Sequence, residues 1–172
     1  MKQKLEDYFI RKYARWRKYK NSFPMISWDE DVPSFMYVGE INNENYVQWK
    51  AIPKDEIYDF SEVKNEYNIE LHPDIKEYFN SYWFLELTGR YEDYSVILEP
   101  VVPGIGLRDF YRNLKEHHHS HGNQLKYIPI GFEADGLIIL VDNETGKVFI
   151  EDHESQTYEK IAENLVDLIE KM

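Results

Sequence analysis

Residues 126–154 read KYIPIGFEADGLIILVDNETGKVFIEDHE, and this stretch decides the fold of the chain. Leu137 to Val141 is an unbroken apolar run, which is typical of a strand buried on both faces. Asp142 to Gly146 then supplies Asx residues that begin a turn and a glycine that can adopt positive φ. Val148 and Ile150 resume a strand after that turn, so the stretch predicts a β-hairpin.

A third strand is predicted just before the apolar run. Tyr127 to Ile130 favours a short strand, and Pro129 places it at a sheet edge because proline cannot donate to a sheet ladder. The three strands together predict an antiparallel core. None of these residues has the pattern of a catalytic site.

The bulk composition predicts one folded domain spanning residues 1–172. A chain of 172 residues can bury one substantial core and is too short for two ordinary domains. No apolar run approaches the roughly 18 residues of a membrane span, and the N-terminal segment lacks the apolar centre of a signal peptide. Because the chain has no cysteine, disulfides and thiolate metal sites are excluded, and we predict a cytoplasmic protein.

The net charge of −12 is divided unevenly along the chain. Residues 1–22 hold eight Lys or Arg against two acidic residues, which gives +6 and leaves −18 on the remainder. An acidic body repels phosphate backbones and attracts basic proteins, so we predict a protein partner with a basic surface and no nucleic acid. The alternative is that the acidity serves solubility alone.

The first helix is predicted from an aromatic stripe with basic residues between its members. This helix ends before Asn21. We expect it to pack on the core, while direct binding to anionic lipid is the alternative function for such a basic amphipathic segment. The stripe consists of Leu5, Tyr8, Phe9, Tyr13, Trp16 and Tyr19.

Alternation, turn residues and capping signals predict the elements between residues 24 and 114. They are a loop from Pro24 to Ser34, a strand over Phe35 to Val38, a turn at Asn42 to Asn45, a strand over Tyr46 to Ile52, a helix within Asp59 to Glu66, a half-buried strand over Tyr67 to Leu71, a helix that begins at Pro73 and has Gly89 just past its end, a strand over Tyr94 to Glu99, a loop from Pro100 to Gly106 and a short helix over Leu107 to Leu114.

The C-terminal segment predicts a final helix capped by Ser155 or Thr157. Its apolar stripe would be Tyr158, Ile161, Leu165, Leu168 and Ile169. With the elements above, this gives an α+β fold: a single domain with a mainly antiparallel sheet of about six strands, flanked by helices, with the N- and C-terminal helices packed on the sheet.

Four histidines at positions 117, 118, 119 and 121 are the strongest candidates for metal chemistry. Imidazole suits zinc, nickel or copper. However, the pattern predicts that residues 117–122 form a polar loop, where consecutive histidines do not converge, and no cysteine or neighbouring carboxylate completes a ligand set. We therefore predict no metal site, and a small metal-dependent enzyme built on these histidines stays only as an alternative.

No other motif predicts catalysis or a cofactor. Asp142 to His153 departs from a calcium loop, which needs glycine at its sixth position and a bidentate glutamate at its twelfth. No nucleophile elbow, Walker loop or metalloprotease histidine pair is present. Acidic pairs such as Glu133 with Asp135 and Glu151 with Asp152 are expected in a chain with 32 acidic residues. We therefore predict a protein that is not an enzyme and that has no cofactor.

The order of these elements resembles the SUKH superfamily, and within it the Syd-like branch. The resemblance spans nearly the whole chain and consists of packing and turn patterns. The segments that carry it are Tyr46 to Pro53, Asp59 to Val63, Ile69 to Ile75, Tyr78 to Trp83, Thr88-Gly89, Asp109 to Leu114, Val141 to Val148 and Ile161 to Leu165.

The resemblance implies binding without catalysis. SUKH proteins are mostly immunity proteins that neutralise a cognate toxin domain, and the Syd branch includes a cytosolic protein that docks on the SecY translocon. Our leading prediction is an immunity protein that occludes a basic toxin domain through an acidic face. The alternative is a protein that binds the cytosolic loops of SecY, peripherally at the cytoplasmic face of the membrane.

Charge and position select the residues expected at the partner-binding face. Carboxylates would pair with lysine and arginine of the partner, while aromatic side chains would supply packed anchors. The candidates are Glu133, Asp135, Glu151, Asp152, Trp83 and Glu86.

Overall fold

The computed structural model describes residues 1–105, 107–155 and 157–172. Gly106, the last residue of the predicted loop from Pro100, lies outside the described residues. The helices within these ranges are α1 (Lys2–Lys20), α2 (Ser61–Tyr67), α3 (Pro73–Ser81), α4 (Arg108–Ser120) and α5 (Leu165–Lys171), with a short 3₁₀ helix at Ser34–Met36.

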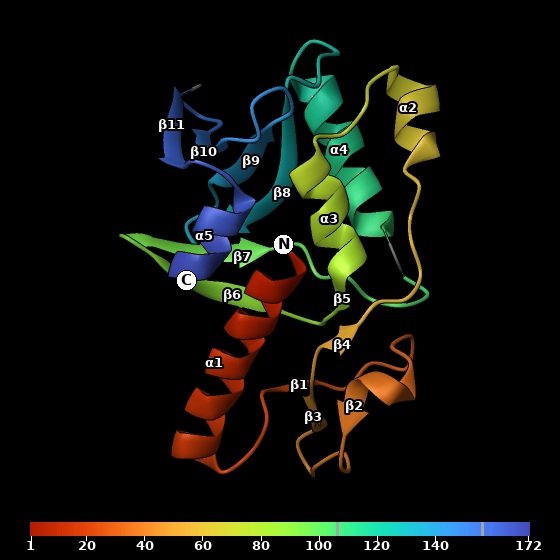
Figure 1. Cartoon of the computed structure of the whole chain (residues 1–172), viewed down its shortest axis with the longest axis vertical. Coiled ribbons are helices and arrows are strands. Elements are labelled where there is room, and N and C mark those ends of the chain that lie inside the picture. The colour runs from red at the N-terminus through yellow and green to blue at the C-terminus, as the bar shows by residue number, and fades with distance from the viewer. Residues whose placement is uncertain (106, 156) are drawn as a thin grey trace.

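A six-stranded antiparallel sheet is the main layer of the fold, in the order β11-β10-β9-β8-β7-β6 (Figure 1). Every pair of neighbours in space is also consecutive in sequence, so the sheet is a meander. Its strands are β6 (Leu87–Tyr91), β7 (Tyr94–Leu98), β8 (Tyr127–Glu133), β9 (Ile138–Asp142), β10 (Val148–Asp152) and β11 (Thr157–Ala162). The predicted α+β fold with helices flanking an antiparallel sheet is confirmed.

The sheet curls around α5, which contacts both outer strands, β6 and β11. Leu165, Leu168 and Ile169 of α5 are fully buried. They join the side chains that alternate along one face of the sheet, such as Ile139 and Val148, in the hydrophobic core. Helices α1 and α3 also contact α5, so three helices close this core face (Figure 1).

Two small sheets lie beside α1, apart from the main sheet (Figure 1). Strands β1 (Met25–Ser27), β2 (Tyr37–Val38) and β3 (Tyr46–Trp49) form the order β1-β3-β2, and β4 (Ile52–Pro53) pairs with β5 (Tyr82–Trp83). The predicted hairpin between β2 and β3 is confirmed. Strand β1 was not predicted, and the segment from Phe35 begins as a 3₁₀ helix before it extends into β2.

The N-terminal helix packs as predicted through the first half of its stripe. Leu5, Tyr8 and Phe9 are buried, and the Tyr8 hydroxyl donates to the Thr88 carbonyl at 2.7 Å. Tyr19, at the far end of the stripe, is exposed. Asn21 ends the helix in the left-handed region, with φ of 51°.

The hairpin predicted at Asp142 to Gly146 is confirmed by its hydrogen bonds. The Asp142 side chain accepts from the backbone N–H groups of Glu144 at 3.0 Å and Thr145 at 2.8 Å. The Gly146 N–H donates to the Asp142 carbonyl at 2.8 Å, with φ of 73° at Gly146. A local turn of this kind is encoded by adjacent residues, which is why the sequence predicts it.

The prediction of an edge strand at Tyr127 to Ile130 is wrong. Strand β8 lies inside the sheet, between β7 and β9. Pro129 is tolerated there because the register with β9 shifts between Pro129 and Gly131, and an interior proline is accommodated at such a bulge. On the other side, pairing with β7 begins only at Gly131.

The half-buried strand predicted over Tyr67 to Leu71 is also wrong. Tyr67 is the last residue of α2, and Asn68 ends that helix with φ of 54°. The helix beginning at Pro73 is confirmed, but it ends at Ser81, and Gly89 lies within β6 instead of just past the helix. Alternation over five residues was too short a pattern to separate a strand from an extended connection.

Two further predictions are wrong: the polar loop at residues 117–122 and the final helix capped by Ser155 or Thr157. Helix α4 runs through Ser120, so His117, His118 and His119 lie in a helix instead of a loop. The predicted final helix begins only at Leu165, capped by Asn164, whose side chain accepts from the Asp167 N–H at 2.8 Å. Thr157 to Ala162 form the edge strand β11 instead.

Candidate functional site

The second face of the sheet is hollowed beside α4. We name this hollow the α4 groove; it comprises two adjoining pockets that share His117, Ser120 and His153. One pocket, of about 370 Å³, lies over β8 and β9 and is lined by Phe132 and Ile138. The other, of about 390 Å³, reaches Glu151 and Tyr158 on β10 and β11.

Strand pairing places the groove residues in one row. Phe132 pairs with Ile138, Ile138 pairs with Glu151, and Glu151 pairs with Tyr158. Because side chains opposite one another in a sheet share a face, these four residues point away from the core face. Phe132 and Tyr158 are 47% and 40% exposed, which leaves aromatic surface open to a partner.

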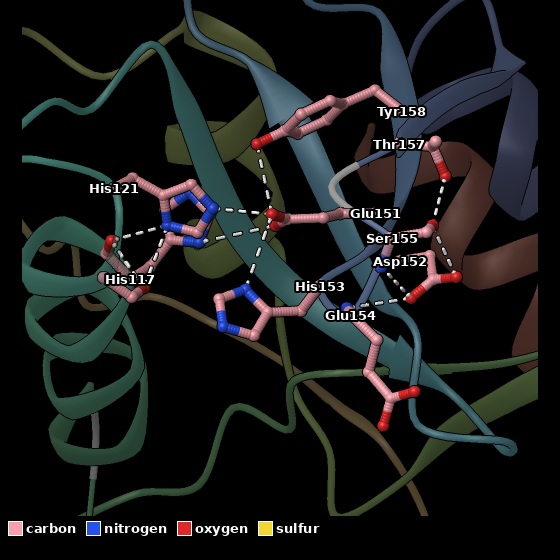
Figure 2. Close-up of polar contacts among 10 residues, drawn as sticks. His117, His121, Glu151, Asp152, His153, Glu154, Ser155, Thr157 and Tyr158 are labelled. Carbon is pink, nitrogen blue, oxygen red and sulfur yellow. Dashed lines mark hydrogen bonds and ion pairs between the residues drawn. The ribbon is translucent and has the colours of Figure 1, made fainter.

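A buried carboxylate lies at the centre of this row. Glu151 is 1% exposed, and its Oε1 accepts from the Tyr158 hydroxyl at 3.1 Å and lies 2.6 Å from His121 Nε2. His117 Nδ1 lies 3.8 Å from Glu151 Oε2, and His153 Nδ1 lies 3.8 Å from Oε1. Figure 2 shows His117 of α4, His121 just after α4 and His153 just after β10 turned toward the same carboxylate.

Helical spacing brings His117 of α4 and His121, the residue that follows the helix, together. Residues four apart share one side of an α-helix, and the imidazole rings of His117 and His121 stack with centroids 3.8 Å apart. Burial lowers the pKa of His117 to about 4, and the neighbouring His121 also lowers it, although Glu151 opposes the shift. His117 is therefore neutral at pH 7, with a lone pair available on one ring nitrogen.

The other end of the groove also holds a buried acid. Glu99 is 8% exposed, and its Oε1 accepts from the Asn113 side-chain amide at 2.5 Å. Burial raises the pKa of Glu99, whereas the Asn113 hydrogen bond opposes that rise. The charged form of Glu99 is therefore destabilised by its position under α4.

Glu133 and Asp135, predicted at the binding face, occupy the turn between β8 and β9. Glu133 is buried, and its carboxylate accepts from the Ser95 N–H at 3.1 Å and from the Asp135 N–H at 2.7 Å. It holds the turn together and is not a solvated surface residue. Asp135 is exposed at the tip of the same turn.

Glu151 and Asp152 resemble Glu133 and Asp135, because the first acid of the pair is buried and the second is more accessible. Glu151 is buried in the histidine cluster, so it does not form a solvated acidic pair with its neighbour. Asp152 is half-buried and closes the turn after β10, where it accepts from the Glu154 N–H at 3.0 Å and the Ser155 hydroxyl at 2.7 Å (Figure 2). The hydrogen bonds from Ser155 lower the pKa of Asp152, which keeps it charged.

Trp83 and Glu86 lie away from the other four candidates. Trp83 is buried in β5, with the Lys54 ammonium 4.0 Å from its ring centroid. Glu86 pairs with Lys12 of α1 at 3.3 Å. The structure thus brings four of the six predicted residues to one end of the main sheet and places two elsewhere.

The sequence reasoning missed His121 and Tyr158 as neighbours of Glu151. The spacing of His117 and His121 was a usable signal, because it matches one helical turn and follows a stripe that already predicts a helix. The contact with Glu151, 30 residues away from His121, carries no comparable local signal.

A second hollow, of about 540 Å³, lies under α1 and is lined by basic side chains including Arg11, Arg15 and Arg90. Lys12 enters it but is paired with Glu86. Burial lowers the pKa of Lys12, and the nearby Glu86 carboxylate opposes that shift. This hollow contains several basic side chains, whereas the α4 groove contains the buried acids Glu99 and Glu151.

Comparison with known proteins assigns the family. The family model described as Syd protein (SUKH-2) matches residues 2–172. The chain belongs to the Syd (SUKH-2) family. The resemblance predicted from the sequence is therefore confirmed.

Individual Syd relatives match over most of their length. Protein Syd of Pseudoalteromonas atlantica is 23% identical, over 99% of this chain and 94% of the relative. Protein Syd of Psychromonas ingrahamii is 27% identical, over 96% and 91% of the two chains. Protein Syd of Colwellia psychrerythraea is also 27% identical, over 87% and 80%. None of the helices in the described residues combines the length and the apolar composition that a membrane span requires.

Proposed function

We propose that this Syd-family protein is a binding module that docks on basic cytosolic loops of the translocon subunit SecY. The observation that carries the proposal is the family match over residues 2–172. The Syd branch includes a protein that docks on SecY, and the relatives above share the Syd name along nearly all of this chain. Docking would be peripheral, at the cytoplasmic face of the membrane.

The surface proposed for docking is the acidic end of the main sheet together with the α4 groove. Asp135 and Glu154 are exposed there, on the turns that follow β8 and β10. Phe132 and Tyr158 expose aromatic surface between them. Acidic rims with aromatic anchors suit a basic polypeptide loop, because the rim steers association and the anchors supply buried contact area.

The buried members of the predicted set take a different role in this proposal. Glu133 and Glu151 hold the turn and the groove floor in place and do not meet the partner directly. Asp135 and Asp152 stay as candidate contacts. Trp83 and Glu86 are distant from this surface and are not included in it.

The order of the two predicted functions is reversed by the family assignment. Sequence reasoning placed toxin neutralisation first and SecY binding second. The Syd name of every relative compared above supports the second. A basic toxin domain is kept as an outcome of the test.

Co-sedimentation with membrane vesicles tests this proposal. Purified protein is mixed with vesicles that contain SecY and with protein-free vesicles of the same lipid, at low and high salt. We expect retention only by the SecY vesicles and release by salt, because exposed charge pairs are screened. Equal retention by protein-free vesicles would replace the proposal with lipid binding through α1.

Charge reversal tests the docking surface separately. The double variant Asp135→Lys/Glu154→Lys should weaken SecY binding by about tenfold, as expected when two exposed ion pairs are lost and repulsion replaces them. Glu40→Lys/Glu44→Lys is the matched control, because it changes the net charge equally at exposed positions of the connection between β2 and β3. Equal loss in both pairs would show a general charge effect and reject the assigned surface.

Failure to bind SecY vesicles at all would reject the partner. Capture of proteins from the native host at low salt would then identify the class of binding partner. Stoichiometric recovery of a basic toxin domain would restore the immunity function, and the same charge-reversal variants would map its binding surface.

A further inference from the structure

We propose that His117, His121 and Glu151 form a binding site for a divalent transition metal of the zinc type. One ligand atom from each residue lies within 4.8 Å of the others. Two neutral imidazoles and a carboxylate are a donor set that zinc accepts readily. This proposal is independent of the partner proposed above.

Two buried polar atoms in the cluster have no hydrogen-bond partner among the described residues. They are His117 Nδ1 and Glu151 Oε2. The side chains that carry them are 4% and 1% exposed. Leaving such atoms without a hydrogen bond in a protein interior costs free energy, so two of them facing each other in one cluster need an explanation.

The separation of these two atoms suits a shared metal better than a hydrogen bond. His117 Nδ1 and Glu151 Oε2 are 3.8 Å apart, which is too long for a hydrogen bond. Two zinc bonds of about 2.0–2.2 Å at a tetrahedral angle span roughly 3.4 Å. A small shift of either side chain would therefore place one ion between them.

His121 is oriented for the same point by its backbone contact. Its Nδ1 lies 2.8 Å from the His117 carbonyl, which can only accept, so the ring donates there. In the neutral ring the lone pair is then on Nε2, 2.6 Å from Glu151 Oε1. At 2.6 Å the two atoms are close enough to share a proton, and an ion bound by both would replace that proton and separate them to roughly 3.4 Å.

The contacts of Glu151 complete the arrangement. The Tyr158 hydroxyl donates to Oε1, and hydrogen bonds of this kind orient carboxylate ligands in metal sites. This leaves Oε2 as the oxygen directed at His117.

A fourth ligand can come from His153 or water. The His153 side chain is 59% exposed, and its Nδ1 lies 3.8 Å from Glu151 Oε1 (Figure 2). The cluster opens into the α4 groove, which gives an ion a path from solvent. His118 and His119 point elsewhere: the His118 ring contacts Tyr67, with centroids 4.9 Å apart, and His119 is exposed.

Zinc titration of the full chain, purified without a histidine tag or metal resin and stripped with a chelator, tests the site. We expect one equivalent of Zn²⁺ to bind with a dissociation constant of micromolar or below. The variant His121→Gln should weaken binding by about 100-fold or more, since even loss of an outer partner costs 10–100-fold. The matched control His118→Gln/His119→Gln removes two neighbouring imidazoles from α4 and should change binding by less than about threefold.

Two further readouts separate a built site from surface chelation. Co²⁺ should give the intense visible absorption of a four-coordinate ion in the wild type and in the control, and lose it in His121→Gln. Zinc at about 100 times its dissociation constant should raise the melting temperature of the wild type by roughly 5–10 °C. His121→Gln should show no such shift, while its melting without metal confirms that it is folded.

The proposal is rejected if the wild type and His121→Gln bind Zn²⁺ equally. It is also rejected if the His118→Gln/His119→Gln control loses as much affinity as His121→Gln, because the metal would then be held by exposed imidazoles. Binding weaker than millimolar in the wild type leads to the same conclusion.

Discussion

The two faces of the main sheet belong to the same six strands but carry different kinds of side chain. The core face, which packs on α5, carries fully buried aliphatic side chains such as Ile139, Val141 and Val148. The face beside α4 carries a buried glutamate and half-exposed aromatic rings, and two histidines from α4 and its C-terminal end pack against it. The first arrangement is what stability requires, whereas buried ionisable groups cost stability and mark a site.

The two faces therefore place different requirements on their residues. On the core face, each side chain only has to be apolar and of suitable size. On the groove face, Glu99, His117 and Glu151 must each find a particular partner. The following changes test this division, beginning with the largest expected effect.

Ile139→Ala should be the most damaging change. Ile139 is fully buried on the core face, so the shorter side chain leaves a cavity and should lower the free energy of unfolding by about 2–5 kcal/mol. The matched variant Phe132→Ala, at a half-exposed position of the groove face, should cost less than about 1 kcal/mol. Urea denaturation measures both, and equal losses would contradict the division between faces.

Acid should destabilise the groove face through His117. Its pKa is about 4 in the folded state and lies near 6.5 when the chain is unfolded, so below pH 6.5 the unfolded state binds the proton first. Stability is therefore complete above pH 6.5 and falls as the pH is lowered toward 4. Between pH 7 and pH 5 we expect a loss of about 2 kcal/mol attributable to this residue.

The variant His117→Gln isolates that contribution, because glutamine does not titrate. Its free energy of unfolding is measured by urea denaturation at both pH values and subtracted from that of the wild type. If the wild type lost no more stability than the variant, the pKa of His117 would not be lower in the folded state than in the unfolded state.

Glu99→Gln should stabilise the protein slightly at pH 7. Burial raises the pKa of Glu99, so its charged form is disfavoured in the folded state above pH 4.5 and this penalty disappears in acid. Glutamine keeps an oxygen for the Asn113 amide and removes the charge. We expect a gain of up to about 1 kcal/mol at pH 7 and a smaller one at pH 4, measured by denaturant titration.

Asp135→Lys should have the smallest effect on stability. The side chain is exposed at the tip of the β8–β9 turn, so we expect a change within about 0.5 kcal/mol. Thermal unfolding measures this. A larger loss would mean that the rim of the groove contributes to folding and is not free to serve a partner alone.

The sequence predicted the local parts of this fold well. The turn at Asp142 to Gly146, the strand at Leu137 to Val141 and the first helix were all confirmed, because hydrogen bonds or side-chain periodicity between near neighbours specify them. The order of the elements also resembled the SUKH superfamily closely enough to identify the family.

The sequence failed where distant strands decided the outcome. Thr157 to Ala162 became β11 because β10 offered a free edge, although the spacing of Tyr158, Ile161 and Leu165 favours a helix. Pro129 lies inside the sheet because a bulge accommodates it. Intrinsic patterns are weak where tertiary pairing competes with them.

By itself, the sequence determined an acidic α+β protein of the Syd family with local turns and helices in place. Only the tertiary structure decided that His117 and His121 face Glu151, and that Glu133 and Glu151 are buried instead of exposed. The physical reason is the range of the interactions: turns and helices form between residues a few positions apart, whereas the groove is assembled by α4 and β10, which meet only when the sheet has formed.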